Sequence, residues 1–106
     1  MILKNITKTI AVSAILASSL MAADVVKIGV QAPITGEYAN EGQSIDNFVR
    51  LIAEEKNAAG GLLGKQIEVV TCDDEAKAQK AAVCAKKLSN EGVIAVIGSY
   101  TSGATE

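Results

Sequence analysis

Small hydroxyl-bearing residues follow a hydrophobic run near the end of the sequence, at residues 99–103. Serine and threonine hydroxyls donate hydrogen bonds, and glycine lets a backbone N–H approach a ligand closely. If a helix begins near Thr105, its positive end faces the same point, and the combination suits an anion, especially a carboxylate. The same residue types also cap helices, so the alternative is that these hydroxyls satisfy the helix's own amides.

Three acidic residues, Asp73, Asp74 and Glu75, form a second candidate site directly after a β-branched run. Paired carboxylates at the end of a strand can hold Mg²⁺. Acidic residues directly before a helix are also favoured by the helix dipole. Because the N-terminus of this sequence indicates export, we expect the acids to cap the following helix, and we predict neither a metal nor a cofactor.

A third candidate segment, residues 32–42, has the proline, glycine and polar residues of a loop that runs into a helix. It carries Tyr38 and Glu41, and either side chain could face the same edge of the fold as the first two segments. A solvated surface loop is the alternative.

The residue types and motifs that catalysis needs are scarce. The sequence has no histidine, so a serine–histidine pair cannot form within it. Ser102 lies in no Gly-x-Ser-x-Gly elbow, and neither a GxxxxGK phosphate loop nor a GxGxxG motif is present. A formal charge of −2 and 3% aromatic residues argue against nucleic-acid binding. We therefore expect a protein that binds a small molecule and is not an enzyme.

The elements that must position these segments alternate along the chain. Three short, β-branched hydrophobic runs are typical of buried strands, at residues 25–31, 66–72 and 93–98. Helical segments separate them, and this alternation predicts an α/β fold: a parallel sheet between two layers of helices, a three-layer sandwich. In such sheets, ligands bind beyond the carboxyl ends of the strands, where the three candidate segments would lie.

The two helical segments differ in their apolar faces. The first has an apolar stripe at helical spacing and a capping box at its start, Asn40 with Gln43 three residues later. The second, residues 76–90, has a face of small alanine side chains that can pack closely on a sheet. The stripe of the first helix consists of Ile45, Phe48, Val49 and Ile52.

The N-terminus has the pattern of a signal peptide, which we expect to occupy residues 1–23. Lys4 and Lys8 flank a polar start, and residues 9–20 form an apolar run that is too short to span a bilayer. Small residues then place the cleavage site after Ala22 or Ala23, and an uncleaved anchor is the alternative. Residues 24–106 would form the folded part.

Cys72 and Cys84 are the two cysteines of the sequence. Export brings the protein into an oxidising compartment, which permits a disulfide. Cys72 ends a predicted strand and Cys84 lies on the following helix, and a bridge needs Cα atoms within about 7 Å. Two buried thiols are the alternative.

Four motifs occur together, in order, and identify a family resemblance. They are Thr-Gly-x-x-Ala-x-x-Gly, Ala-Gly-Gly-x-x-Gly-Lys, the strand-end Asp-Asp and Val-Ile-Gly-x-x-x-Ser, within "VKIGVQAPITGEYANEGQS" and the stretch from "AEEKNAAGG" to "VIGSYTSGAT". Jointly they resemble the N-terminal part of periplasmic branched-chain amino acid binding proteins, the leucine/isoleucine/valine-binding components of ABC importers. The resemblance implies the type I periplasmic-binding fold, of which this sequence would hold three strands and two helices of the first of two lobes.

The resemblance also implies roles for particular residues. Ser102 matches the serine that binds the α-carboxylate of the ligand, and Tyr100 and Thr101 match positions that line the side-chain pocket or lie beside it. Glu41 stands where well-known members have a tyrosine that contacts the ligand. Tyr38, three residues earlier, could compensate for that difference, which leaves the identity of the ligand open.

The function that the resemblance implies is capture of leucine, isoleucine or valine in the periplasm and delivery to the membrane subunits of an ABC permease. The mechanism would be closure of the two lobes on the ligand, without chemistry. The alternatives are a ligand-sensing ectodomain of a receptor, an exported enzyme, and a binding protein for another amino acid or an amide.

Overall fold

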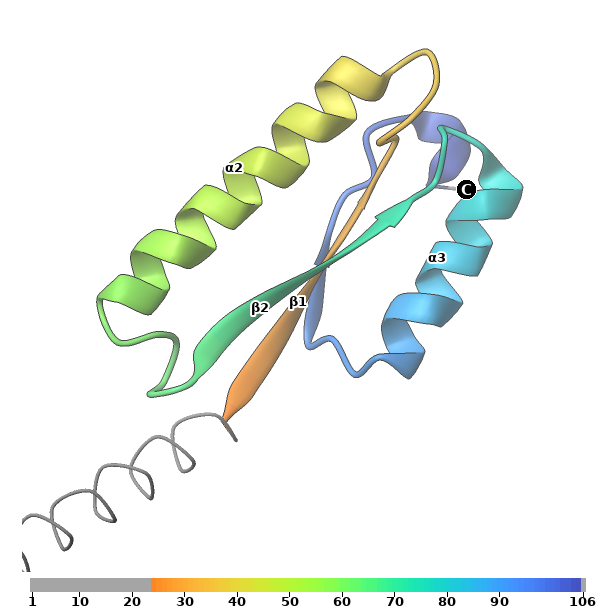
Figure 1. Ribbon diagram of the computed structural model, residues 1–106. Helices are drawn as coiled ribbons and strands as arrows, with labels where there is room; N and C mark the ends of the chain where they lie inside the picture. Colours follow the sequence, from red (N-terminus) through yellow and green to blue (C-terminus); the bar gives the residue numbers. More distant parts are fainter. Residues whose placement is uncertain (1–23, 106) are drawn as a thin grey trace, which may run out of the picture.

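The computed structural model describes residues 24–105, and the expected signal peptide with its cleavage site after Ala22 or Ala23 lies outside them. Three strands alternate with two helices, and a short 3₁₀ turn follows the last strand (Figure 1). The elements are β1 (Val25–Ala32), α2 (Ala39–Ala58), β2 (Gln66–Asp73), α3 (Ala78–Asn90), β3 (Ala95–Ile97) and η1 (Ser102–Ala104).

The three strands form one parallel sheet in the order β2-β1-β3. Helix α2 covers one face of this sheet and α3 covers the other (Figure 1). The predicted α/β fold, with a parallel sheet of three strands and two helices, is therefore confirmed. Because all three strands run the same way, the loops that follow them meet at one edge of the sheet, which we call the carboxyl edge.

The core consists of two small clusters, one on each face of the sheet. Under α2, Val30 and Ala32 of β1 pack against Val49. Under α3, Cys72 packs with Cys84 and Leu88, and Leu88 is fully buried. Central strand β1 is the most buried of the three strands, since residues 29–32 are all buried.

Polar side chains fasten α2 to β2 along its length. Asn57, near the end of α2, accepts a hydrogen bond from the amide of Ile67 (2.7 Å) and donates one to its carbonyl (2.9 Å). Near the middle of the helix, Arg50 Nη2 donates to Thr71 Oγ1 (2.7 Å), and Thr71 also bonds to Asp46. These polar contacts hold the helix on the strand at two points, in addition to the apolar packing of Val49.

The predicted capping box at the start of α2 is wrong. The helix begins at Ala39, and its cap residue Tyr38 makes no side-chain capping bond. Gln43 Nε2 instead donates to the carbonyl of Ile34 in the preceding loop (3.0 Å). The loop packs so closely on the first turn that a Cβ at Gly42 would overlap the Pro33 carbonyl. Contact with the loop, rather than a cap, sets where this helix begins.

Much of the predicted apolar stripe of α2 is exposed. Only Val49 of the four stripe residues is buried, whereas Phe48 is 61% exposed and Ile52 39%. Phe48, Val49 and Ile52 line one side of a groove of about 320 Å³, and residues of the sheet line the other side. We call it the apolar groove. Its lining includes Ile28, Phe48, Val49, Ile52, Ile67 and Ile97. Within residues 24–105, neither helix combines the length and apolar character needed to cross a membrane.

Candidate functional site

Three loops meet at the carboxyl edge (Figure 1). The first loop, residues 33–38, follows β1, the second loop, residues 74–77, follows β2, and the third loop, residues 98–101, follows β3 and leads into η1. All the residues that the sequence singled out for ligand binding lie in these loops or in the first turn of α2 or η1. This edge is therefore the candidate site.

Two aromatic rings join the first and third loops. The ring centroids of Tyr38 and Tyr100 lie 5.8 Å apart, with the rings tilted by 54°. This is a favourable separation and tilt for an aromatic pair. Tyr38 is half-buried and Tyr100 is exposed, so the pair presents aromatic surface at the carboxyl edge.

The hydroxyls of Ser99 and Thr105 are used within the third loop and the turn after it. They lie 2.5 Å apart, and both are within hydrogen-bonding distance of the Thr101 carbonyl, at 3.3 and 3.1 Å. These contacts close residues 99–105 into a compact turn. Serine and threonine commonly stabilise loops in this local way.

The hydroxyls of Thr101 and Ser102 are not used in this way. Thr101 Oγ1 is buried without a hydrogen-bond partner in the described part of the chain. Thr101 is the cap residue of η1 yet makes no side-chain capping bond, so the capping alternative does not describe its hydroxyl. Ser102 is exposed, and its hydroxyl forms no hydrogen bond with any of residues 24–105. Two hydroxyls next to the carboxyl edge thus have no hydrogen-bond partner among residues 24–105.

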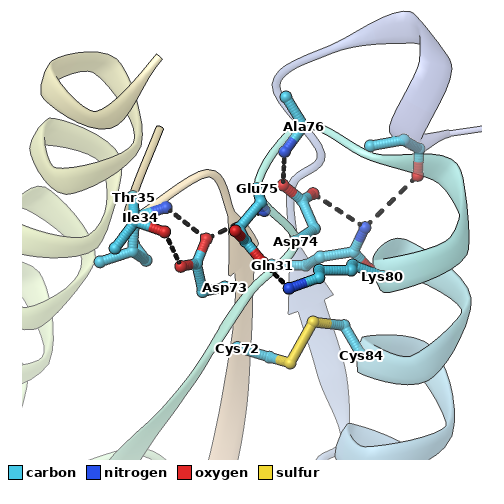
Figure 2. Close-up of a disulfide and its surroundings, with 11 residues drawn as sticks. Gln31, Ile34, Thr35, Cys72, Asp73, Asp74, Glu75, Ala76, Lys80 and Cys84 are labelled. Carbon is cyan, nitrogen blue, oxygen red and sulfur yellow. Dashed lines mark hydrogen bonds and ion pairs between the residues drawn. A yellow bond between two sulfur atoms is a disulfide. The ribbon is translucent and has the colours of Figure 1, made fainter. Parts of the chain in front are cut away.

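A disulfide lies beneath the loops. Cys72, near the end of β2, is bonded to Cys84 in α3, with 5.6 Å between their Cα atoms (Figure 2). Of the two states that the sequence left open, this is the one present, and both residues are buried. The bond ties the start of the second loop to the helix that follows it.

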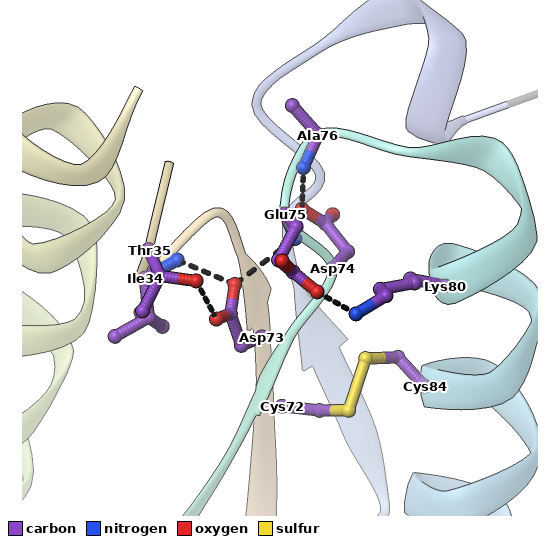
Figure 3. Close-up of polar contacts among 9 residues, drawn as sticks. All are labelled: Ile34, Thr35, Cys72, Asp73, Asp74, Glu75, Ala76, Lys80 and Cys84. Atoms are coloured by element: carbon purple, nitrogen blue, oxygen red, sulfur yellow. Dashed lines mark hydrogen bonds and ion pairs between the residues drawn. A yellow bond between two sulfur atoms is a disulfide. The ribbon is translucent and has the colours of Figure 1, made fainter. Parts of the chain in front are cut away.

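Asp73 joins the first loop to the second (Figure 3). Its Oδ1 accepts hydrogen bonds from the amides of Ile34 (2.8 Å) and Glu75 (2.9 Å). Its Oδ2 accepts one from Thr35 Oγ1 (2.6 Å). Hydrogen bonds to an ionised acceptor are among the stronger ones, so this single side chain holds both loops together.

Asp74 is fully buried and is also satisfied by the protein itself. Its Oδ1 accepts from the amide of Ala76 (2.9 Å), and its Oδ2 accepts from Gln31 Nε2 (3.2 Å) (Figure 2). Gln31 Nε2 lies also within 3.4 Å of the carbonyl of Ala104. Gln31 was not among the residues singled out from the sequence. A polar residue at the end of a largely apolar strand could have marked it as part of the site.

The prediction that the acidic cluster caps α3 is wrong. Helix α3 begins at Ala78, its cap residue Lys77 makes no side-chain capping bond, and its first turn holds no acidic residue. The two aspartates instead accept amides two residues ahead, in tight turns that hold Glu75 and Ala76 at positive φ (48° and 58°). The carboxylate oxygens thus face N–H and O–H donors, an arrangement that connects loops.

Glu41 stands apart from the other candidate residues. It is exposed in the first turn of α2, where a negative charge is favoured by the helix dipole. No polar contact joins it to Tyr38 or to the third loop within residues 24–105. The structure therefore brings together Tyr38, Tyr100, Thr101 and Ser102, and leaves Glu41 at the margin.

Comparison with known proteins places the chain in a family. The profile of the periplasmic binding protein family matches residues 25–106. The leucine-, isoleucine-, valine-, threonine- and alanine-binding protein of Pseudomonas aeruginosa is 38% identical over 90 residues, which are 85% of this chain and 24% of that protein.

The chain is also similar in structure to solved substrate-binding proteins. The branched-chain amino acid transporter substrate binding protein LivJ of Streptococcus pneumoniae, in complex with isoleucine, matches with a TM-score of 0.72 and 40% identity, over 76% of this chain and 24% of LivJ. A solute binding protein of an ABC transporter from Rhodopseudomonas palustris, in complex with 3,4-dihydroxybenzoic acid, matches with a TM-score of 0.67 and 32% identity, over 76% and 22%. The chain spans about a quarter of the length of these relatives.

Proposed function

This chain belongs to the periplasmic binding protein family, and we propose that it is part of an exported solute-binding protein that captures a branched-chain amino acid. Residues 1–23 would be the signal peptide, removed after Ala22 or Ala23, and the mature protein would act in the periplasm. The membrane subunits of an ABC permease would receive the ligand. The names of the relatives support this assignment.

The observation that carries the proposal is the pair of free hydroxyls, Thr101 and Ser102, at the carboxyl edge. A buried hydroxyl without a partner costs about 1–3 kcal/mol, a cost that a bound acceptor removes. In the proposed complex, Ser102 Oγ donates to the α-carboxylate of the ligand. One such charge-assisted bond contributes about 1.5–3 kcal/mol.

The aromatic pair would form one wall of the pocket. Tyr38 and Tyr100 present apolar ring surface beside the hydroxyls, which suits the side chain of leucine, isoleucine or valine. Glu41, at the margin of the site, would take a secondary part in ligand contact. Residues outside the described part would complete the pocket and bind the amino group. Binding and closure of two lobes would be the whole mechanism, without a catalytic step.

The test is calorimetric titration of the full-length mature protein with leucine, isoleucine, valine and chemically unrelated amino acids. We expect tight binding of the branched-chain set, and a loss of about 1.5–3 kcal/mol in Ser102→Ala. Ser89→Ala is the matched control, because Ser89 is also exposed but lies in the last turn of α3, at the end of the helix away from the carboxyl edge. Equal affinities of Ser102→Ala and Ser89→Ala would show that Ser102 does not bind the carboxylate.

A second candidate ligand is an aromatic carboxylic acid. The tilted Tyr38–Tyr100 pair beside two hydroxyl donors suits a ring that carries a carboxylate, and the Rhodopseudomonas palustris relative is in complex with such an acid. Titration with benzoate and its hydroxylated derivatives separates the two candidates. Binding of the benzoates in place of the amino acids would keep the site and change the ligand class.

A further inference from the structure

One residue, Gln31, contacts both ends of the segment that carries the free hydroxyls. At the first end, Gly98 lies so close to the backbone of Gln31 that a Cβ on it would overlap the Gln31 carbonyl, and its φ of +133° also favours glycine. At the other end, Gln31 Nε2 lies 3.4 Å from the carbonyl of Ala104. The end of β1 thus lies against both ends of residues 98–104.

Asp74 determines how the Gln31 amide is oriented. Asp74 Oδ2 accepts from Gln31 Nε2 at 3.2 Å, and a carboxylate flanked by N–H donors can only accept. If the amide were reversed, its oxygen would face both the carboxylate and the Ala104 carbonyl, which is repulsive at each contact. The carboxylate therefore directs the two N–H groups of Gln31, one to Asp74 and one to Ala104.

The backbone around Gln31 and Asp74 is held in place by contacts with neighbouring elements. Gln31 lies opposite Cys72 in the β1–β2 register, and Cys72 is bonded to Cys84 in α3. The amide of Asp74 donates to the carbonyl of Ala32 (3.1 Å). Ala104 is buried where η1 packs on α3. A shift of the turn would therefore require the Gln31 amide or α3 to move.

We propose that Gln31 and Asp74 are positioning residues, which hold the Ser102–Ala104 turn so that Ser102 presents its hydroxyl to the ligand carboxylate. Neither side chain touches the ligand in this arrangement. The inference rests on the proposed function, because Gln31 and Asp74 affect binding through Ser102, which binds the ligand carboxylate in that proposal. It adds a buried hydrogen-bonded pair, one residue from the end of β1 and one from the second loop, to the parts that determine affinity.

The test is a double-mutant cycle on the full-length mature protein with Gln31→Met and Ser102→Ala. Methionine keeps the length and volume of glutamine but removes both donors. We expect Gln31→Met to weaken leucine binding about 10-fold in the wild-type background. In the Ser102→Ala background we expect less than about a 2-fold further change, because the positioned group is then gone. Gln79→Met, on the exposed surface of α3, is the matched control and should bind as wild type does.

A second measurement does not depend on ligand. Amide hydrogen exchange of the ligand-free protein should be faster over residues 99–105 in Gln31→Met, with exchange in β1 and β2 unchanged. Asp74→Asn should accelerate exchange over the same residues, because its side chain no longer dictates the orientation of the Gln31 amide. Exchange that is unchanged over residues 99–105 would overturn the proposal, and so would exchange that rises throughout the chain, which is the mark of general unfolding.

The binding outcomes separate this inference from the function beneath it. Equal weakening by Gln31→Met with and without Ser102 would assign Gln31 a merely structural role and overturn the inference, while leaving the proposed function intact. Unchanged binding in Gln31→Met would do the same. If the wild-type protein binds neither amino acids nor aromatic acids, the proposed function fails, and the ligand role of Gln31 fails with it.

Discussion

The two flanks of the central strand β1 are built very differently. On the β2 flank, eight residues of each strand are paired, from Val25 with Gln66 to Ala32 with Asp73. On the β3 flank only three pairs form, and every residue of β3 is exposed. The disulfide and both aspartates lie on the β2 flank, and Leu88 of α3 packs under Gly29 of the central strand, whereas the apolar groove extends to the β3 flank.

This difference shows which parts of the molecule stabilise one another. The loops of the carboxyl edge are held by hydrogen bonds and by a disulfide that residues 24–105 supply themselves. The strand β3 and the apolar groove leave large apolar side chains in contact with solvent, among them Phe48 and Ile97. Burial of apolar surface is the main favourable term in folding, so substitutions on the two flanks should have unequal effects on stability.

The largest difference should come from matched truncations of two apolar side chains, one buried under the central strand and one exposed on β3. Leu88→Ala removes a fully buried side chain and should lower the free energy of unfolding by about 2–5 kcal/mol. Ile97→Ala removes a side chain that is 44% exposed and should cost less than about 1.5 kcal/mol in the chain of residues 24–106. Urea unfolding followed by circular dichroism measures both. Equal losses would mean that β3 is buried in solution.

Loss of the disulfide should have the next largest effect. Replacing Cys72 and Cys84 together by alanine opens a loop with a sequence separation of 12, which corresponds to about 3 kcal/mol of stability. Thermal unfolding of the double variant against wild type, both without reductant, measures the loss. Wild type treated with reductant is the control and should approach the double variant. A double variant as stable as wild type would show that the hydrogen bonds of Asp73 and Asp74 suffice alone.

The smallest effect should come from the apolar groove. Phe48→Ser should change the free energy of unfolding of the chain of residues 24–106 by less than about 0.5 kcal/mol, because most of the ring is exposed. It should also reduce binding of a fluorescent apolar dye. Val49→Ser, one residue along and buried, is the matched control and should be clearly destabilising. A large loss in Phe48→Ser would show that another surface covers the groove.

The elements were predictable because each one rests on local pattern. The β-branched runs predicted all three strands, and the positions of the two helices followed from helical periodicity and alanine content. What failed depends on contacts between distant segments. Asn40 and Gln43 have the spacing of a capping box, but Gln43 instead bonds the carbonyl of Ile34, nine residues earlier. No local rule predicts that contact.

The candidate site was predicted only in part, for the same reason. The hydroxyl residues of the third loop could be recognised from their types and from the family resemblance. The acids at the end of β2 were recognised but given the wrong partners, since Asp73 bonds Ile34 and Thr35 across 39 and 38 residues of sequence. Gln31 bonds Ala104 across 73 residues. Such pairs become visible only once the strands are placed side by side.

The contact between Tyr38 and Tyr100 has a practical consequence for engineering. The two rings sit on different loops, and neither ring takes part in the hydrogen bonds of Asp73, Asp74 or Gln31. Exchanging the rings for smaller or larger side chains would therefore reshape the wall of the proposed pocket and leave these hydrogen bonds in place. In the proposed pocket, ligand selectivity could thus be changed without changing the fold, which makes positions 38 and 100 the natural pair to randomise together in a library of biosensors.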